Sequence, residues 1–93
     1  MNYKLYSVRD NKAELSGQVM MFVNDNVATR TLSPAVNDKT HNYGQYPEDY
    51  DLFCIGDYSD ETGEITYEKE NIEGHNVITT RKVCNLSELL VGE

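Results

Sequence analysis

Residues 46–67, YPEDYDLFCIGDYSDETGEITY, determine how the rest of the chain can fold. Their centre, residues 52–55 (LFCI), is a four-residue apolar run between turn signals, which is typical of a strand with both faces covered. A turn is expected at residues 47–49, because proline presets the backbone and acidic residues tolerate turn geometry. Gly63 can adopt the left-handed conformation that closes a hairpin loop. Residues 64–68 (EITYE) alternate polar and apolar, which predicts a returning strand with one face in water.

The N-terminal part of the chain predicts two strands followed by one helix. Residues 3–8 (YKLYSV) and 18–23 (QVMMFV) are rich in aromatic, β-branched and other apolar residues, which is typical of strands. An Asn-Asp-Asn run predicts the start of a helix that spans about residues 25–37. Pro34 predicts a kink or break near Ser33, or a second short turn that begins at this Ser-Pro pair.

The remaining segments complete one small domain. Residues 37–45 and 69–76 are polar and are expected to be loops, whereas residues 77–83 (VITTRKV) are β-branched and predict a strand. Residues 85–90 resemble a short helix with an asparagine cap and a glutamate three residues later. The order β-β-α-β-β-β suits one mostly antiparallel sheet with the helix on one face, so we expect a single α+β domain over residues 1–93.

The formal net charge of −8 is unevenly distributed along the chain. Residues 1–46 carry five basic and four acidic side chains, whereas residues 47–93 carry three basic and twelve acidic ones. An acidic protein repels nucleic-acid phosphates at long range. Any contact with nucleic acid is therefore expected to use a local face of the N-terminal half, while the C-terminal half faces solvent or a basic partner.

Cysteine usage and hydropathy point to a reducing compartment. Cys54 and Cys84 are too few for a disulfide framework, and Cys54 lies in the apolar run, where cysteine behaves as a small hydrophobic residue. The N-terminus lacks the apolar segment of a signal peptide, and no stretch has the length of a transmembrane helix. We therefore expect a soluble cytoplasmic protein with no membrane association.

Catalytic and metal-binding patterns do not stand out in the sequence. Acidic residues beside the apolar run point to opposite faces and do not converge on one site, and those at the hairpin end lack the spacing of a calcium loop. Both groups are expected to solubilise turns. They are Glu48, Asp49, Asp51, Asp57, Asp60, Glu61 and Glu64. His41 and His75 form no close ligand pairs with the cysteines, which argues against zinc and against a Cys–His nucleophile. There is no glycine-rich phosphate loop, so we expect no cofactor, no metal and no enzymatic activity.

Basic residues interleaved with tyrosines form the one remaining candidate site. Proteins that bind single-stranded nucleic acid combine a cationic track with aromatic rings on which bases stack. The residues predicted to make such contacts are Lys4, Tyr6, Arg9, Lys12 and Arg30. Strand parity places Lys4 and Tyr6 on one face and Tyr3 and Leu5 on the other. The alternative interpretation places the tyrosines in the core or in a dimer interface, with the cations on a solvated face.

Three groups of motifs give the chain a resemblance to a known family. They are YSV and DNKA within residues 6–13, FVND through AVND at residues 22–38, and PEDYDLFCIG with a Thr-Gly hairpin at residues 47–63. On these motifs the sequence resembles the small nonstructural protein of gokushovirus-type microviruses, which are single-stranded DNA phages. The chain departs from the family's usual pattern at residues 15–18, where a proline-rich link is frequent, and at Pro34.

The resemblance implies a phage-encoded protein outside the capsid, of a kind generally described as DNA-binding. Its implied role is in single-stranded genome synthesis or in the switch to packaging, within the cytoplasm of the infected bacterial host. The first functional hypothesis is therefore a non-enzymatic factor that acts on single-stranded DNA or on its replication complex. The alternative is an acidic homodimeric adaptor that engages a host or viral replication protein, because the open edges of a small sheet call for a partner.

Overall fold

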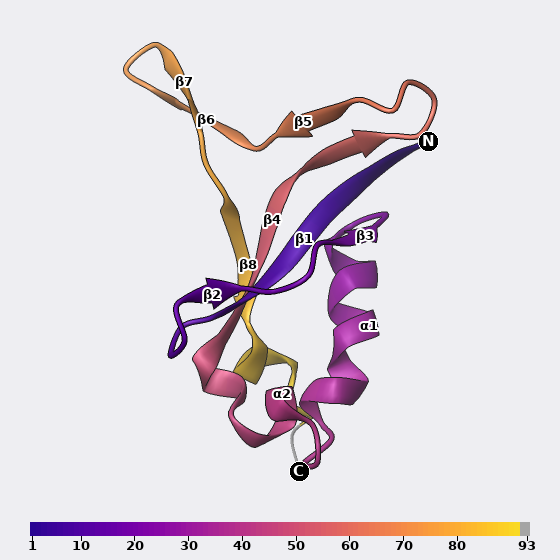
Figure 1. Ribbon diagram of the computed structural model, residues 1–93, viewed down its shortest axis with the longest axis vertical. Helices are drawn as coiled ribbons and strands as arrows, with labels where there is room; N and C mark the ends of the chain where they lie inside the picture. The colour runs from indigo at the N-terminus through magenta and orange to yellow at the C-terminus, as the bar shows by residue number, and fades with distance from the viewer. Residues whose placement is uncertain (92–93) are drawn as a thin grey trace.

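The computed structural model describes residues 1–91, which form an α+β fold. A six-stranded antiparallel sheet carries one main helix, and a separate two-stranded hairpin projects from its upper end (Figure 1). The strands are β1 Asn2–Asp10, β2 Leu15–Ser16, β3 Met20–Phe22, β4 Tyr50–Ser59, β5 Ile65–Tyr67, β6 Lys69–Ile72, β7 His75–Ile78 and β8 Arg81–Asn85. The helices are α1 Asp25–Val36 and α2 Asn42–Gln45, with the 3-10 helices η1 Pro47–Asp49 and η2 Leu86–Leu89. No helix within residues 1–91 is long and apolar enough to cross a membrane.

The long antiparallel pair β1–β4 is the spine of the sheet. Tyr6 lies opposite Cys54 and Val8 opposite Leu52, and an irregularity follows, because Leu5 lies opposite Gly56. The other edge of β1 pairs with β2 and β3, and the other edge of β4 pairs with β8 and β5. Every strand of the sheet therefore lies beside one member of this central pair.

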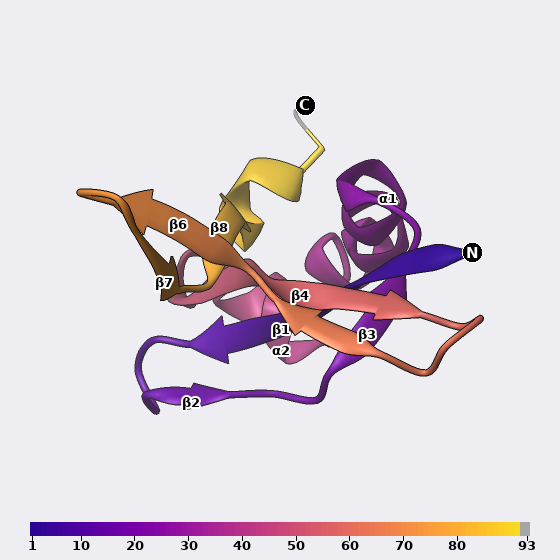
Figure 2. The same cartoon turned by 90° about the horizontal axis from the view of Figure 1, so that it is seen from above.

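The apolar run at residues 52–55 is confirmed as part of a strand, but only one of its faces is fully covered. Leu52 and Cys54 are completely buried, whereas Phe53 and Ile55 are half-buried. Seen from above, α1 and the yellow η2 lie on one side of the β1–β4 pair (Figure 2). The prediction that both faces are covered is therefore confirmed for the face toward α1 and η2 and is only partly met on the other face, where Phe53 and Ile55 are half-buried.

Helix α1 begins and ends close to the predicted bounds of about residues 25–37. The Asn24 side chain caps it by accepting a hydrogen bond from the backbone N–H of Val27 at 2.9 Å. Of the alternatives predicted near Ser33, a break or a separate second turn is wrong, because one helix continues through Pro34 to Val36. Proline has no N–H to donate to the carbonyl four residues earlier, so the helix passes Pro34 with one backbone hydrogen bond fewer.

The core lies between α1, the lower halves of β1 and β4, and the C-terminal segment. Its buried members are Tyr6, Val8, Ala28, Leu32, Val36, Leu52, Cys54, Cys84 and Leu86. The C-terminal cap is confirmed: Asn85 and Glu88 form a capping box at the start of η2, although the turn is 3-10 and not α-helical. This small core holds the lower half of the sheet and leaves the upper half without a helical cover.

The hairpin β6–β7 replaces a predicted loop. Residues 69–76 were expected to be irregular, but most of them pair in two strands joined at Glu73 and Gly74, which have φ of 51° and 83°. Two successive positive φ values are typical of the primed turns that match the twist of hairpins. The predicted strand at residues 77–83 is divided accordingly, between β7 and β8.

Strand β5 is exposed along its whole length, although the alternation of EITYE predicted one buried face.

Candidate nucleic-acid interface

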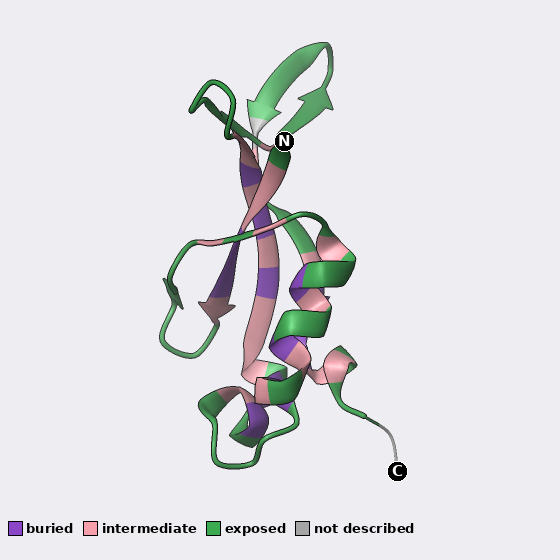
Figure 3. Cartoon of the chain, turned by 90° about the vertical axis from the view of Figure 1, so that its right-hand side faces the viewer, coloured by how far each residue is buried: buried purple, intermediate pink, exposed green. Residues whose placement is uncertain are grey.

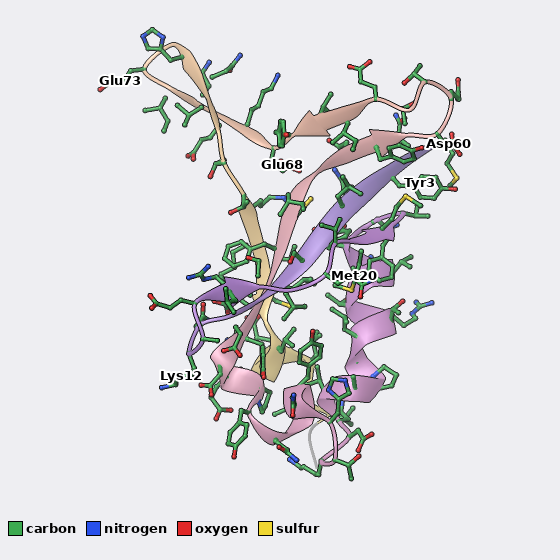
Figure 4. The ribbon with its side chains drawn as sticks, viewed as in Figure 1. Tyr3, Lys12, Met20, Asp60, Glu68 and Glu73 are labelled. Atoms are coloured by element: carbon green, nitrogen blue, oxygen red, sulfur yellow. The ribbon has the colours of Figure 1, made fainter. Side chains whose placement is uncertain are left out.

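The structure does not gather the five predicted DNA-contacting residues on one surface. Lys4 and Tyr6 lie on the helix-covered face of β1, as parity predicts. Arg9 is half-buried near the other end of β1, and Lys12 is exposed in the turn that follows (Figure 4). Arg30 is exposed on α1. A continuous cationic track made of these residues is therefore absent from the part of the chain that the structure describes.

Tyr6 is held in the core by a polar network. Its ring is 0% exposed, and its hydroxyl donates a hydrogen bond to Asp25 Oδ1 at 2.6 Å. The Arg81 guanidinium donates to both carboxylate oxygens of Asp25, at 3.0 and 3.1 Å. These bonds lower the pKa of Asp25, with Arg81 as the main cause, while burial is the main cause that raises the pKa of Tyr6. Tyr6 consequently ties β1 to α1 and offers no ring face to a base.

Lys4 is the one predicted cation that lies close to other candidate groups. Its ammonium donates to Asp57 Oδ1 at 3.1 Å, and this bond is the main cause that raises the pKa of Lys4. The same residues line a cleft of about 690 Å³ at the upper end of the sheet, to which Tyr3, Tyr58 and Glu64 also contribute. The cleft therefore brings a lysine beside two tyrosines, within an acidic rim.

The sheet surface opposite α1 carries several of the aromatic residues that remain accessible. Cross-strand register aligns Tyr3 with Tyr58 and Ile65 in one row, and Met21 with Leu5, Gly56 and Tyr67 in the next. We call the six residues with side chains in these rows the open face: Tyr3, Leu5, Met21, Tyr58, Ile65 and Tyr67. Tyr67 is 60% exposed and Ile65 is 55% exposed, whereas Tyr3 and Tyr58 are half-buried. Sequence parity separated Tyr3 from Tyr6, but it could not show which face the helix covers.

An apolar hollow of about 530 Å³ lies beside these rows. We call this cavity the hollow. It is lined by Leu5, Val19, Ile55, Ile65, Tyr67, Thr79 and Thr80. A Cβ on Gly56 would lie 2.4 Å from the Thr66 backbone oxygen, so only glycine allows β5 to approach β4 this closely. The lower part of this sheet surface is closed by the segment between β2 and β3, because Ser7 Oγ donates to the Gly17 oxygen at 3.0 Å.

The two cysteines and His41 make contacts that stabilise the fold. Burial is the main cause that raises the pKa of both Cys54 and Cys84, which keeps both thiols protonated, and the Cys54 thiol donates to Glu68 Oε1 at 3.3 Å. His41 Nδ1 accepts from the backbone N–H of Tyr43 and caps α2. Within residues 1–91, no three His, Cys, Asp or Glu side chains are grouped as they would be around a metal ion.

Comparison with known proteins places the chain in a family. A search of curated proteins and of solved structures found no match. The family model described as Phage ORF5 protein matches residues 3–88, which include the spine of the sheet, α1, the projecting hairpin and most of η2. The match covers well over half of the sequence. The chain therefore belongs to the Phage ORF5 protein family.

Proposed function

We propose that this phage protein is a non-enzymatic, single-stranded-DNA-binding factor of gokushovirus-type microviruses. It acts in viral genome synthesis or in the switch to packaging, in the cytoplasm of the infected bacterium and outside the capsid. Membership of the phage family and the motifs within residues 6–63 support the viral setting. The observation that carries DNA binding is the pair Tyr3–Tyr58, which lies in cross-strand register on the face that α1 leaves uncovered.

Stacking supplies most of the affinity in this proposal. Sheet surfaces that bind single strands present aromatic rings on which unpaired bases stack, at about 1–3 kcal/mol per base. Tyr3 and Tyr58 form such a pair, and Lys4 lies in the adjoining cleft, where a phosphate can replace Asp57 as its partner. Duplex DNA keeps its bases stacked internally, so it binds more weakly than a single strand.

Phosphate contacts are few, because the net charge is −8 and three cations are paired with carboxylates. The three cations proposed to contact phosphates are Lys4, Arg9 and Lys12, which do not form a continuous track and are spread over about 20 Å of β1 and the turn after it. Three phosphates neutralised on a single strand give a slope of log K against log salt of about −2. A slope of this size is small for a DNA-binding protein, and it follows from the acidic composition.

Fluorescence anisotropy with labelled single- and double-stranded oligonucleotides over a salt series tests the proposal. Tyr58→Ala is expected to weaken single-strand binding about tenfold, because one stacking contact is lost. Tyr46→Ala is the matched control, since Tyr46 is exposed at the start of η1 and does not belong to the open face. Absence of single-strand binding at low salt, or an equal loss in both variants, refutes DNA binding on this face.

A second candidate function is an acidic homodimeric adaptor for a host or viral replication protein. The observation that favours it is the hairpin end between β4 and β5, where Asp60, Glu61 and Glu64 are exposed. The N-terminal ammonium lies 2.6 Å from Asp60 Oδ1 and 3.3 Å from Glu61 Oε1, so Glu64 and the remaining charge of that pair face a basic partner. Retention of a replication protein that survives nuclease treatment, and is lost in Glu61→Lys/Glu64→Lys, supports this candidate over DNA binding.

A further inference from the structure

Strands β5 and β6 follow one another along the upper border of the molecule (Figure 1). One side of β5 pairs with β4, and one side of β6 pairs with β7. No further strand pairs with either of them within residues 1–91. Every residue of both strands is exposed, and β6 belongs to the green hairpin at the top of Figure 3. We call the unpaired side of residues 64–72 the outer edge.

The hydrogen bonds between β4 and β5 show which backbone groups of β5 point to the outer edge. The Ser59 N–H donates to the Glu64 oxygen at 3.0 Å, so these two residues form a hydrogen-bonded pair. Hydrogen-bonded and non-hydrogen-bonded pairs alternate along an antiparallel ladder. The N–H and C=O groups of Ile65 and Tyr67 therefore point away from β4.

Glu68 connects the ladder of β5 to that of β6. Its N–H donates to the Ile55 oxygen at 3.4 Å, and its oxygen accepts from the Thr79 N–H at 2.9 Å. Because both backbone groups of a strand residue point to the same side, β4 and β7 lie on one side of this segment and the outer edge lies on the other. The residues whose backbone groups point outward are Ile65, Tyr67, Lys69 and Asn71. Such a row of unpaired donors and acceptors is a template for a further strand.

The side chains along the outer edge divide between two faces. Alternation places Ile65 and Tyr67 on one face, where they are 55% and 60% exposed and line the hollow. The other face carries Glu64, Thr66, Glu68, Glu70 and Ile72. The edge therefore presents an apolar pair on one face and three carboxylates on the other.

We infer that the outer edge binds an extended basic segment of a partner protein, which adds to β5 and β6 as an antiparallel strand. Main-chain hydrogen bonds hold such a strand, and the side chains of the edge select its sequence. Directly opposite residues on neighbouring strands interact, so basic residues are favoured opposite Glu64, Glu68 and Glu70. Apolar residues are favoured opposite Ile65 and Tyr67, where they extend the apolar surface of the hollow.

The charge of the outer edge decides between such a partner and a second copy of the chain. Antiparallel self-pairing centred on Tyr67 would set Glu64 of one copy opposite Glu70 of the other, at both ends of the contact. Like charges directly opposite each other destabilise a pair of strands, whereas a basic segment neutralises the same carboxylates. The contact does not depend on DNA binding, because Tyr3 and Tyr58 lie on other strands, and it gives the second candidate function a mode of contact.

A labelled peptide, acetyl-KTKVTVK-amide, tests the added strand by fluorescence anisotropy with the full chain. In the antiparallel register its lysines lie opposite Glu70, Glu68 and Glu64, and its valines lie opposite Tyr67 and Ile65. The peptide combines the charge and the alternation that the edge favours, so it is expected to bind.

Two substitutions of one charge type test where the peptide lies. Glu70→Lys is expected to weaken binding about fivefold at about 0.15 M salt, because attraction becomes repulsion at a contact position. Glu73→Lys makes the same change of charge in the turn beyond the edge, and it is expected to weaken binding less than twofold. Both residues are exposed, and circular dichroism checks that both variants remain folded.

N-methylation of the peptide separates backbone pairing from charge. In the proposed register the N–H of the first valine points to β5, whereas the N–H of the second threonine points to solvent. Methylation of the valine nitrogen is expected to weaken binding at least tenfold, and methylation of the threonine nitrogen less than threefold. Amide exchange measured by NMR at Tyr67 and Lys69 is expected to slow at least tenfold with saturating peptide. Thr66, whose backbone is already bonded to β4, is the unchanged reference.

Absence of binding at millimolar peptide, or equal losses from the two methylated peptides, overturns the added strand. Unchanged exchange at Tyr67 and Lys69, or equal effects of Glu70→Lys and Glu73→Lys, also overturns it. Slow exchange at these two amides in the chain alone, at high protein concentration, overturns it as well, because a second copy then covers the edge. Binding of oligonucleotides is measured separately, so failure of this contact and failure of DNA binding are distinguished.

Discussion

The two faces of the β1–β4 pair use tyrosine in opposite ways. On the helix side, Tyr6 is fully buried, and its hydroxyl is bonded to a carboxylate that a guanidinium also holds. On the other side, Tyr67 lies in an aromatic and aliphatic row that no helix covers, and 60% of its surface is in contact with solvent. Tyrosine is therefore a buried, hydrogen-bonded core residue on one face and a solvent-accessible residue on the other.

This difference comes from what covers each face and not from the composition of the strands. The stripe of Ala28, Leu32 and Val36 on α1 is long enough to cover only the lower half of one face. Apolar side chains elsewhere on the sheet are left in water, at a cost of about 25 cal/mol per Å² relative to burial. Exposed apolar patches mark interaction sites, and the proposed contact with single-stranded DNA assigns this face an occupant.

The largest predicted effect is on the covered face. Leu52→Ala is expected to lower the free energy of unfolding by about 3 kcal/mol, because Leu52 is fully buried between the sheet and the helices and its loss leaves a cavity. Urea denaturation followed by far-ultraviolet circular dichroism measures the change. In a small domain of modest stability, a loss of this size removes much of the total.

Ile65→Ala is the comparison for Leu52→Ala on the open face. Ile65 is 55% exposed on the edge strand β5, so its truncation is expected to change the free energy of unfolding by less than about 0.5 kcal/mol. A loss near that of Leu52→Ala, measured at a concentration where the chain is a monomer, contradicts the assignment of β5 to an uncovered face.

The second prediction concerns the hydrogen bond of Tyr6 on the covered face. Tyr6→Phe keeps the ring in the core but removes the hydroxyl that donates to Asp25 at 2.6 Å. The free energy of unfolding is expected to fall by about 1–2 kcal/mol, since the lost hydrogen bond is to a charged group. Equilibrium denaturation near neutral pH measures the loss, and a stability equal to that of the wild type shows that the network does not hold β1 to α1.

Much of the fold could be predicted, because its signals are local. The apolar run at residues 52–55, the Asn24 cap of α1 and the capping box at Asn85 each depend on neighbouring residues, and each is present. The hairpin β6–β7 could not be predicted, because residues 69–76 (KENIEGHN) are polar and its turn uses Glu73 in a conformation that asparagine or glycine usually occupies. A two-stranded hairpin that does not pack against the core needs no buried face, so its sequence lacks a clear alternation of apolar and polar residues.

The candidate site depends on tertiary contacts, which limits what the sequence can indicate. Parity correctly placed Tyr3 and Tyr6 on opposite faces, but the pattern of β1 alone does not show which face receives α1. The bond between Asp25 and Arg81 joins residues 56 positions apart, and no motif links them. The cations that are close together in the sequence analysis are consequently separated in the structure: Lys4 is paired with Asp57, Lys12 lies in a turn and Arg30 lies on α1.

The third prediction is a pH dependence that comes from Asp25. Its pKa is lowered in the folded chain, so its contribution to stability is present above the unfolded pKa of about 3.9 and is lost as pH falls through the folded value. Asp25→Asn is expected to cost less than about 1 kcal/mol at neutral pH, because the carboxylate is more than one-third exposed and solvent screens the pair.

The measurement is the difference in unfolding free energy between Asp25→Asn and the wild type, taken from neutral pH to below pH 4. This difference is expected to shrink as the carboxylate becomes protonated, since both chains then carry a neutral group at this position. Lys4 lowers the pKa of the same carboxylate less than Arg81 does, so Lys4→Met serves as a control with a weaker effect. A difference that stays constant with pH shows that the charge on Asp25 contributes nothing.

The smallest effect is predicted for Tyr67→Phe, which removes from the open face the same atom that Tyr6→Phe removes from the covered one. No hydrogen bond of the Tyr67 hydroxyl is present among the described residues, so the monomer's free energy of unfolding is expected to change by less than about 0.5 kcal/mol. Urea denaturation at low protein concentration shows whether the Tyr67 hydroxyl is bonded within the single chain. Equality with the wild type at low concentration supports an uncovered face. A loss at low concentration as large as that of Tyr6→Phe means that the hydroxyl is bonded in the single chain, and the contrast between the two faces then fails.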